Sequence, residues 1–277
     1  MKWVAVVITL WLALLPVRTA SAGSPHVAAR PLTPLGALKA TMDAWLTKLC
    51  ADPDLACAAN PSQLTLYAAA ADPPNVAWGI LASEPALARL RWSATASAWV
   101  AERVWSFASH IHSVAKVDAQ PPFAIYPTLY PIGPHAWGVA LVQTVVEMYS
   151  GGGASFAIAD LVSLSETDES FAPVLRGVTL SCNKMVRACF SEDDYRRLAT
   201  NCHDLYDGFL TFSYAQGASP DRYEWTAVWH ERDQGQGMSK SQAVSTGQRI
   251  KVPQEAADRA RVFRSVSICG GGPMEEG

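Results

Sequence analysis

The sequence lacks the short motifs that identify the commonest catalytic chemistries. It contains no Gly-x-Ser-x-Gly elbow, no His-Glu-x-x-His helix, no Rossmann glycine pattern, no Cys-x-x-Cys pair and no internal repeat. These absences remove the usual signatures of α/β hydrolases, zinc peptidases, dinucleotide-binding enzymes and thiol oxidoreductases. A serine or cysteine hydrolase stays open, because the members of a catalytic triad come from distant residues. Nothing in the sequence favours one.

Excess positive charge and long apolar runs are also missing. The formal net charge is −3, so no basic surface for nucleic acid is expected. Beyond the first residues no apolar run approaches the ~20 residues that a membrane-spanning helix needs. The expected partner is a protein or a glycan and not a nucleic acid. The chain is expected to have no membrane span after signal cleavage. No cofactor and no metal are expected.

The first 22 residues have the composition of a secretory signal peptide. Lys2 precedes a short apolar run from Trp3 to Leu15, and Ala20-Ser21-Ala22 forms a small-x-small cleavage site. Cleavage there would leave 255 residues (277 minus 22) and change the formal charge from −3 to −5, because Lys2 and Arg18 are lost. We therefore expect a periplasmic or secreted protein. The alanine content and the preference for arginine over lysine suggest a bacterial source.

An even number of cysteines in an exported chain predicts disulfides. The chain has six cysteines. Cys50 and Cys57 lie close together and far from the others, so we pair them. Among the other four we favour Cys189 with Cys202 and Cys182 with Cys269. The alternative joins Cys182 to Cys189 and Cys202 to Cys269. A zinc site is disfavoured because cysteine ligands usually lie closer together.

The N-terminal part is expected to be helical. Thr33-Pro34 resembles a helix start, and apolar residues at helical spacing follow it up to Cys50. Trp92, Ala96 and Trp99 recur at a similar spacing further on. The expected helices cover residues 33–50, 62–70, 83–90 and 93–115.

The C-terminal part is expected to be a β-sheet built around one hairpin. Two β-prone runs between Trp137 and Leu164 flank the glycine-rich turn 150–153. Further strands are expected at 123–132, 174–182, 209–214, 223–230 and 262–268. Ser191 with Asp194 resembles a capping box for a short helix at 192–200. Residues 232–248 show no apolar period and are expected to form a long flexible loop, and a short helix is expected at 253–261.

These elements predict an α+β fold with N-terminal helices packed on a mainly antiparallel sheet of five or six strands, stabilised by disulfides. The expected organisation is a signal peptide (1–22), a helical N-terminal region (23–118), an antiparallel β-rich region (119–269) and a disordered tail (270–277). Whether the two middle regions form one domain or two stays open, with any boundary near 118–122.

Three groups of residues resemble sites, but their spacing favours a structural role. The glycines at 151–153 lack the Lys-Ser/Thr and the helix of a phosphate-binding loop, so a plain turn is preferred. His110 and His112 are placed on a helix, where residues i and i+2 do not face each other. The acidic residues Glu166, Asp168 and Glu169 do not match the spacing of a calcium loop.

Two further groups are candidate binding residues. His203, Asp204 and Asp207 could form an acid/base pair or hold a cation, although an ordinary turn leading into a strand is preferred. Tyr223, Trp225 and Trp229 recur on one face of a strand and could stack on a sugar or a peptide. Burial against the core is the commoner use of such residues.

The leading functional hypothesis is a non-enzymatic exported binding or accessory protein. It would recognise a protein or glycan partner through its sheet face or through the 232–248 loop. The alternative is a secreted hydrolase, with or without a metal, that uses His203, Asp204 and Asp207. A structural or assembly accessory is a third interpretation.

Overall fold

The computed structural model describes most of the chain between residues 27 and 271. The described residues are 27–37, 39–55, 57, 60–82, 85–108, 110, 123–164, 171, 173–198, 201–253, 263 and 266–271. The expected signal peptide, the expected boundary at 118–122, His112 and the acidic residues at 166–169 lie outside them. So do most of the expected helix at 253–261 and most of the tail. The expected strand at 262–268 is wrong, because its described residues, 263 and 266–268, belong to no strand.

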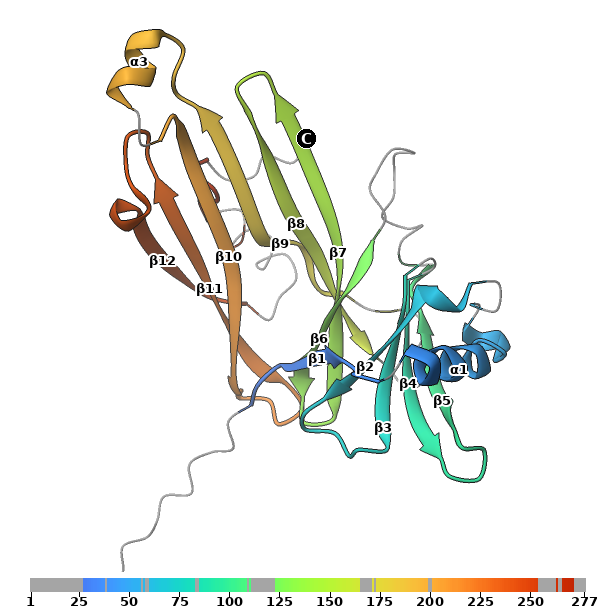
Figure 1. The fold of residues 1–277 in the computed structure, drawn as a ribbon. Helices are drawn as coiled ribbons and strands as arrows, with labels where there is room; N and C mark the ends of the chain where they lie inside the picture. The colour runs from blue at the N-terminus through green and yellow to red at the C-terminus, as the bar shows by residue number, and fades with distance from the viewer. Residues whose placement is uncertain are drawn as a thin grey trace, which may run out of the picture.

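The fold is a single antiparallel sheet in the order β12-β11-β10-β9-β8-β7-β6-β1-β2-β3-β4-β5. The long strands β7 to β11 and the edge strand β12 form one side of the molecule, β2 to β5 form the other, and β1 and β6 join them (Figure 1). The strands are β1 (Arg30–Pro34), β2 (Leu64–Ala69), β3 (Val76–Leu81), β4 (Ala86–Ser93), β5 (Ala98–Ser106), β6 (Ala124–Gly133), β7 (Ala136–Tyr149), β8 (Gly152–Leu164), β9 (Pro173–Arg187), β10 (His203–Gln216), β11 (Tyr223–Gln234) and β12 (Val244–Lys251).

The expected α+β architecture is therefore wrong. The expected helices at 62–70, 83–90 and 93–115 are replaced by β2, β4 and β5, and the sheet has twelve strands instead of five or six. β3 is buried along its whole length, so its sequence shows no alternation to distinguish a strand from a buried helix. β4 contains an irregularity between Arg89 and Leu90, which interrupts its period of two.

The helices are few and short in the described part of the chain. α1 (Lys39–Leu49) covers β2 to β5 (Figure 1), and its Trp45 packs edge-on against Trp92 of β4 and Trp99 of β5. The expected helix at 33–50 is thus partly right, but Thr33 lies in β1 and caps nothing. Short 3-10 turns are η1 (Pro53–Leu55), η2 (Pro61–Gln63) and η3 (Lys240–Gln242). No described helix combines the length and apolar character needed to cross a bilayer.

α3 (Glu192–Arg197) confirms the predicted capping box. The Ser191 hydroxyl accepts the Asp194 N–H, and the Asp194 carboxylate accepts the N–H of Ser191. The hydrogen bond from Ser191 and the backbone N–H of Phe190 lower the pKa of Asp194, so its carboxylate stays charged at neutral pH.

The predicted hairpin is the centre of the long-stranded part. β7 and β8 pair from Trp137 opposite Leu164 to Tyr149 opposite Gly152, and Ser150-Gly151 closes the turn. The half of β7 near Trp137 is covered on both faces, since Val139, Ala140 and Leu141 are all fully buried. The other half is increasingly exposed towards the turn, so only part of the strand contributes to the core.

The strands expected at 209–214 and 223–230 are present as β10 and β11, which are longer than expected and pair with each other. The two strands pair from Leu205 opposite Gln234 to Gln216 opposite Tyr223. The expected flexible loop at 232–248 is wrong, because β11 extends to Gln234 and residues 244–251 form the edge strand β12. The sequence of β12 shows no alternation of apolar and polar residues, because this strand is exposed almost throughout.

Three disulfides fasten the fold. They join Cys50 to Cys57, Cys182 to Cys269 and Cys189 to Cys202, which are the pairs that the cysteine spacing favoured. The first closes the segment after α1, the second ties the end of the chain to β9, and the third spans α3. Three disulfides suggest an oxidising compartment outside the cytosol.

Candidate functional site

Tyr223 stands between two hollows where β11 begins, near the junction of the two parts of the sheet. The first hollow has a volume of about 320 Å³. Most of its lining is apolar, and Arg222 and Glu224 supply one charge of each sign. Its lining residues are Ile132, Ser163, Pro173, Val174, Leu175, Arg222, Tyr223, Glu224, Trp225, Val252 and Pro253.

The second hollow shares Tyr223 with the first and has a volume of about 480 Å³. Arg30 and Trp137 border it, with the Arg30 guanidinium 4.1 Å from the centre of the indole ring. Asp72 fixes Arg30 through an ion pair of 3.0 Å and also accepts the Trp78 indole N–H. We call the two hollows together the Tyr223 site.

Close contact between two hairpin turns creates this site. Gly133 ends β6, and a Cβ atom there would lie 2.2 Å from the carbonyl oxygen of Asp221 in the turn before β11. Only glycine allows the two turns to approach this closely. The contact places Tyr223 beside the β6–β7 turn, so residues distant in sequence line one surface.

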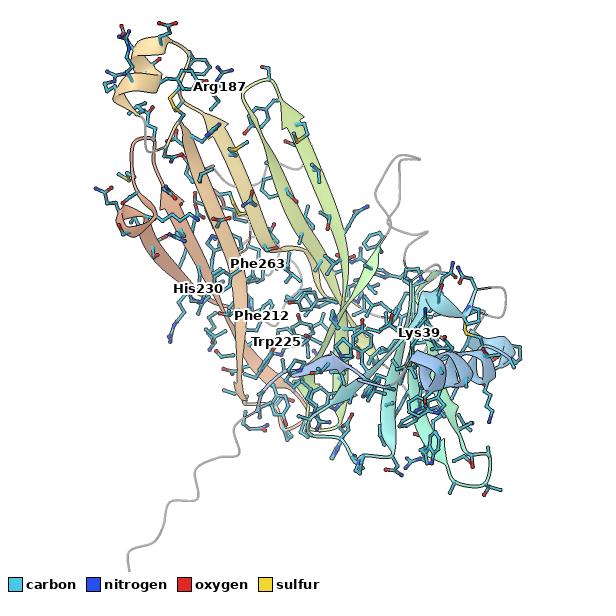
Figure 2. The ribbon with its side chains drawn as sticks, viewed as in Figure 1. Lys39, Arg187, Phe212, Trp225, His230 and Phe263 are labelled. Carbon is cyan, nitrogen blue, oxygen red and sulfur yellow. A yellow bond between two sulfur atoms is a disulfide. The ribbon has the colours of Figure 1, made fainter. Side chains whose placement is uncertain are left out.

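Trp225 and Trp229 belong to the core, which is the alternative that the sequence favoured for them. They are 6% and 3% exposed. Trp225 packs edge-on against Phe212, with 5.3 Å between ring centres, and against Tyr214 at 5.0 Å. Phe212 and Trp225 lie next to each other in Figure 2. Burial raises the pKa of Tyr214 and of nearby Tyr130 far above the usual value. Of the three aromatic candidates, Tyr223 is the one that is both partly exposed and shared by the two hollows.

The structure does not gather His203, Asp204 and Asp207 into one constellation. All three lie near the start of β10, where neighbouring side chains point to opposite faces of the sheet. Asp204 accepts the backbone N–H of Gln236, whereas Asp207 bonds the side-chain amide of Asn183 on the opposite face. The geometry therefore gives no support to an acid/base pair of His203 with either aspartate.

Asp204, Glu231 and Asp233 all lie near Tyr206, and Glu231 anchors the segment around Cys269. The Glu231 carboxylate accepts the N–H groups of Cys269 and Gly270 and the indole N–H of Trp229, all at 2.8–2.9 Å. Glu231 is only 9% exposed. Satisfying three donors, two of them buried, is a structural role, so we assign this group to the fold and not to catalysis.

Asp233 is the member of this group that should make stability depend on pH. Its pKa is raised above 3.8 by desolvation and then by the charge of Glu231 and a hydrogen bond to it. A carboxyl whose pKa is raised in the folded state contributes stability below its unfolded pKa and loses it as pH rises through the folded pKa. We therefore expect Asp233→Asn to gain stability relative to the original chain as pH rises from about 4 to about 7.

Urea denaturation across that pH range measures the effect. Asp207→Asn is the matched control, because Asp207 is an exposed aspartate on the opposite face of the neighbouring strand. A variant Asp233→Asn whose advantage grows towards low pH would contradict the assignment.

The remaining histidine candidate is also structural. His110 is 7% exposed, and its Nε2 lies 3.1 Å from Asp160, whose other oxygen accepts the N–H of Gly177. This pair ties the segment after β5 to β8. Among the described residues, no group of three or more His, Cys, Asp or Glu side chains is arranged to hold a metal ion.

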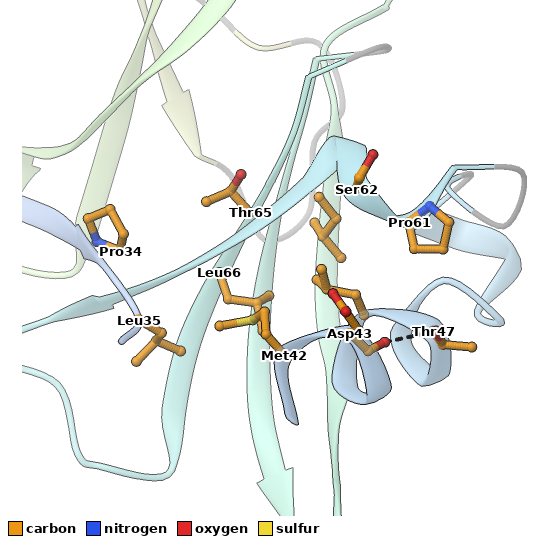
Figure 3. Close-up of a pocket in the computed structure, with 11 residues that line it drawn as sticks. Pro34, Leu35, Met42, Asp43, Thr47, Pro61, Ser62, Thr65 and Leu66 are labelled. Carbon is orange, nitrogen blue, oxygen red and sulfur yellow. Dashed lines mark hydrogen bonds between the residues drawn. The ribbon is translucent and has the colours of Figure 1, made fainter. Parts of the chain in front are cut away.

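A third hollow, of about 470 Å³, separates α1 from β2 (Figure 3). Leu35, Met42, Leu46 and Leu66 supply apolar side chains, and Asp43 is the ionisable residue of its lining. The hydroxyl of Thr47 is bonded to the backbone carbonyl of Asp43 on the same helix. This lining carries one charged side chain, whereas the Tyr223 site carries Arg30, Arg222 and Glu224, so the Tyr223 site offers more charged groups for recognition.

Comparison of the chain with protein-family models, with curated proteins and with solved structures found no match. The site therefore has to be judged from its own geometry. Sequence reasoning found Tyr223 but missed Arg30 and Trp137, which reach it from β1 and β7. Gly133-Pro134 was a usable turn signal, but nothing in the sequence indicated which other turn it would meet.

Proposed function

We propose that this is an exported, non-enzymatic binding protein that holds a peptide segment of a protein partner in the Tyr223 site. The shared position of Tyr223 between two hollows is the observation that carries this proposal. Small-ligand and peptide sites are typically mostly apolar, with a few polar groups that fix orientation. The three disulfides and the signal-like first 22 residues support a periplasmic or secreted location.

The lining favours a peptide over a glycan. Aliphatic and proline side chains dominate the first hollow, and the buried Trp225 offers little free ring face for a sugar. Two hollows that share Tyr223 in their linings suit two apolar side chains of an extended segment. Arg222 and Glu224, which carry opposite charges, would orient its backbone or flanking charges.

Binding to an array of extended peptides with aromatic or branched apolar side chains tests the proposal. We expect the purified mature protein to bind a subset of these peptides. Tyr223→Ala should weaken that binding at least about tenfold, which is the effect of removing a central aromatic contact. Tyr223→Phe keeps the ring and should bind nearly as well.

Tyr126→Ala is the matched control, since Tyr126 is 48% exposed on β6 and borders neither hollow. Its binding should stay within about twofold of the original. Peptide binding that is indifferent to Tyr223→Ala would contradict the proposal. So would retention on an oligosaccharide array with none on the peptide array.

A further inference from the structure

Exposed apolar side chains gather at the end of the long strands opposite the Tyr223 site. Met148 is 78% exposed, Phe190 73% and Val146 59%. Together with Met185, Arg187 and Tyr195 they form what we call the distal platform. It lies where β7 and β9 end beside α3, near Arg187 in Figure 2. Clusters of exposed apolar residues of this kind usually mark interaction surfaces.

The platform residues share one face of the sheet. Val146 and Met148 lie two positions apart on β7, and Met148 packs over Gly153, which is paired with Met185. Arg187 follows Met185 by two positions and so points the same way. Phe190 and Tyr195 join this face through Arg187, whose guanidinium lies 5.5 Å from the Phe190 ring and donates to the Tyr195 hydroxyl at 2.9 Å.

Several interactions hold the exposed rings in place. The Arg187 Nε–H donates to the carbonyl of Cys189, and the Cys189–Cys202 disulfide closes the segment that carries α3. The capping box formed by Ser191 and Asp194 fixes the start of the helix. Because Phe190 and Tyr195 are already held in place by Arg187, they lose little additional conformational freedom when a partner covers them.

The charges beside the platform are divided along α3. Its first half carries Glu192, Asp193 and Asp194, and its second half carries Arg196 and Arg197. A partner of one charge sign would be attracted to one half and repelled by the other. An identical helix running antiparallel would place acidic residues against arginines at both ends.

We propose that the distal platform binds a second copy of this chain, with a two-fold axis near Tyr195. The apolar side chains of the two platforms cover each other, and the ion pairs between α3 helices set the register. Exposed intrahelical pairs such as Arg196–Asp193, at 75% and 87% side-chain exposure, exchange for intermolecular ones at little cost. An isologous interface of this type closes as a dimer.

Sedimentation velocity of the mature protein at concentrations from about 1 to 100 µM tests this. We expect a monomer–dimer equilibrium. The double substitution Phe190→Ser/Met148→Ser should raise the dissociation constant of the dimer at least about tenfold. Phe209→Ser is the control, because Phe209 is 53% exposed on the same face of β10 but lies away from α3. A monomer at every concentration would overturn the proposal, as would a dimer unaffected by the double substitution.

A charge-swap experiment separates self-association from loss of folding. Glu192→Arg/Asp193→Arg and Arg196→Glu/Arg197→Glu should each be monomeric alone and should form a heterodimer when mixed. Failure of the mixture to associate would contradict the antiparallel pairing. Binding of the original chain to neutral or anionic vesicles, lost in Phe190→Ser/Met148→Ser without any dimer, would instead identify a lipid surface and overturn the proposal. The peptide-array result at the Tyr223 site does not depend on either outcome.

Discussion

Replacing Trp229 with alanine is expected to lower the free energy of unfolding by about 3–5 kcal/mol. The side chain is 3% exposed, and its indole N–H is one of the three donors to the Glu231 carboxylate. A Cβ atom built on Gly208 would lie 2.2 Å from the Trp229 ring, which shows how closely β10 packs over it. Truncation therefore opens a cavity and weakens the anchor of the Cys269 segment. Urea denaturation followed by tryptophan fluorescence and circular dichroism measures the change.

Phe209→Ala provides the comparison. Phe209 lies one position from Gly208 on β10, is 53% exposed and stacks on His230 on the solvent side. Its truncation should change stability by less than about 1 kcal/mol. Equal effects of the two substitutions would show that Trp229 is not a core residue. This distinction matters for binding experiments. If Trp229 is a core residue, a loss of partner binding in Trp229→Ala reports unfolding and not the loss of a contact with the partner.

Removal of the Cys182–Cys269 disulfide should have the other large effect. The two cysteines are separated by 87 residues, and closing a loop of that length restricts the unfolded chain by about 4.6 kcal/mol in the chain-entropy treatment. The paired substitution Cys182→Ala/Cys269→Ala should lower stability by that order. The same treatment gives about 2.4 kcal/mol for Cys50–Cys57, which spans 7 residues.

Comparing the two paired variants tests the loop-length argument within one protein. Under non-reducing conditions, the free energy of unfolding should be lower for Cys182→Ala/Cys269→Ala than for Cys50→Ala/Cys57→Ala. The reverse order would indicate that the Glu231 hydrogen bonds to Cys269 and Gly270 hold the end of the chain without the covalent link.

The N-terminal half shows why helical spacing misled the sequence analysis. Trp92 and Trp99 are seven residues apart, which fits two helical turns. In the structure they face each other across the β4–β5 hairpin, at 5.5 Å between ring centres. A hairpin with a short turn places residues of this separation side by side just as a helix does. Aromatic and β-branched residues at these positions were the signal that favoured strands.

The C-terminal half was more predictable because its elements are defined locally. Alternation over Tyr223, Trp225 and Trp229 placed β11 correctly, and the glycines after Ser150 marked the turn of the first hairpin. The Tyr223 site was harder to predict from the sequence. The ion pair of Arg30 with Asp72 and the contact of Gly133 with Asp221 join residues 42 and 88 positions apart, and no local pattern specifies such distances.

Hydrogen–deuterium exchange of the mature protein, with and without a peptide selected from the array, tests the binding proposal most directly. Protection should appear in the segments around 131–137 and 222–225, which border the two hollows on either side of Tyr223. Tyr223→Ala should abolish that protection while leaving the exchange of the free protein elsewhere unchanged. Peptide-induced protection confined to α3 and the β7–β8 turn, or none at all with bound peptide, would contradict the assignment of the Tyr223 site.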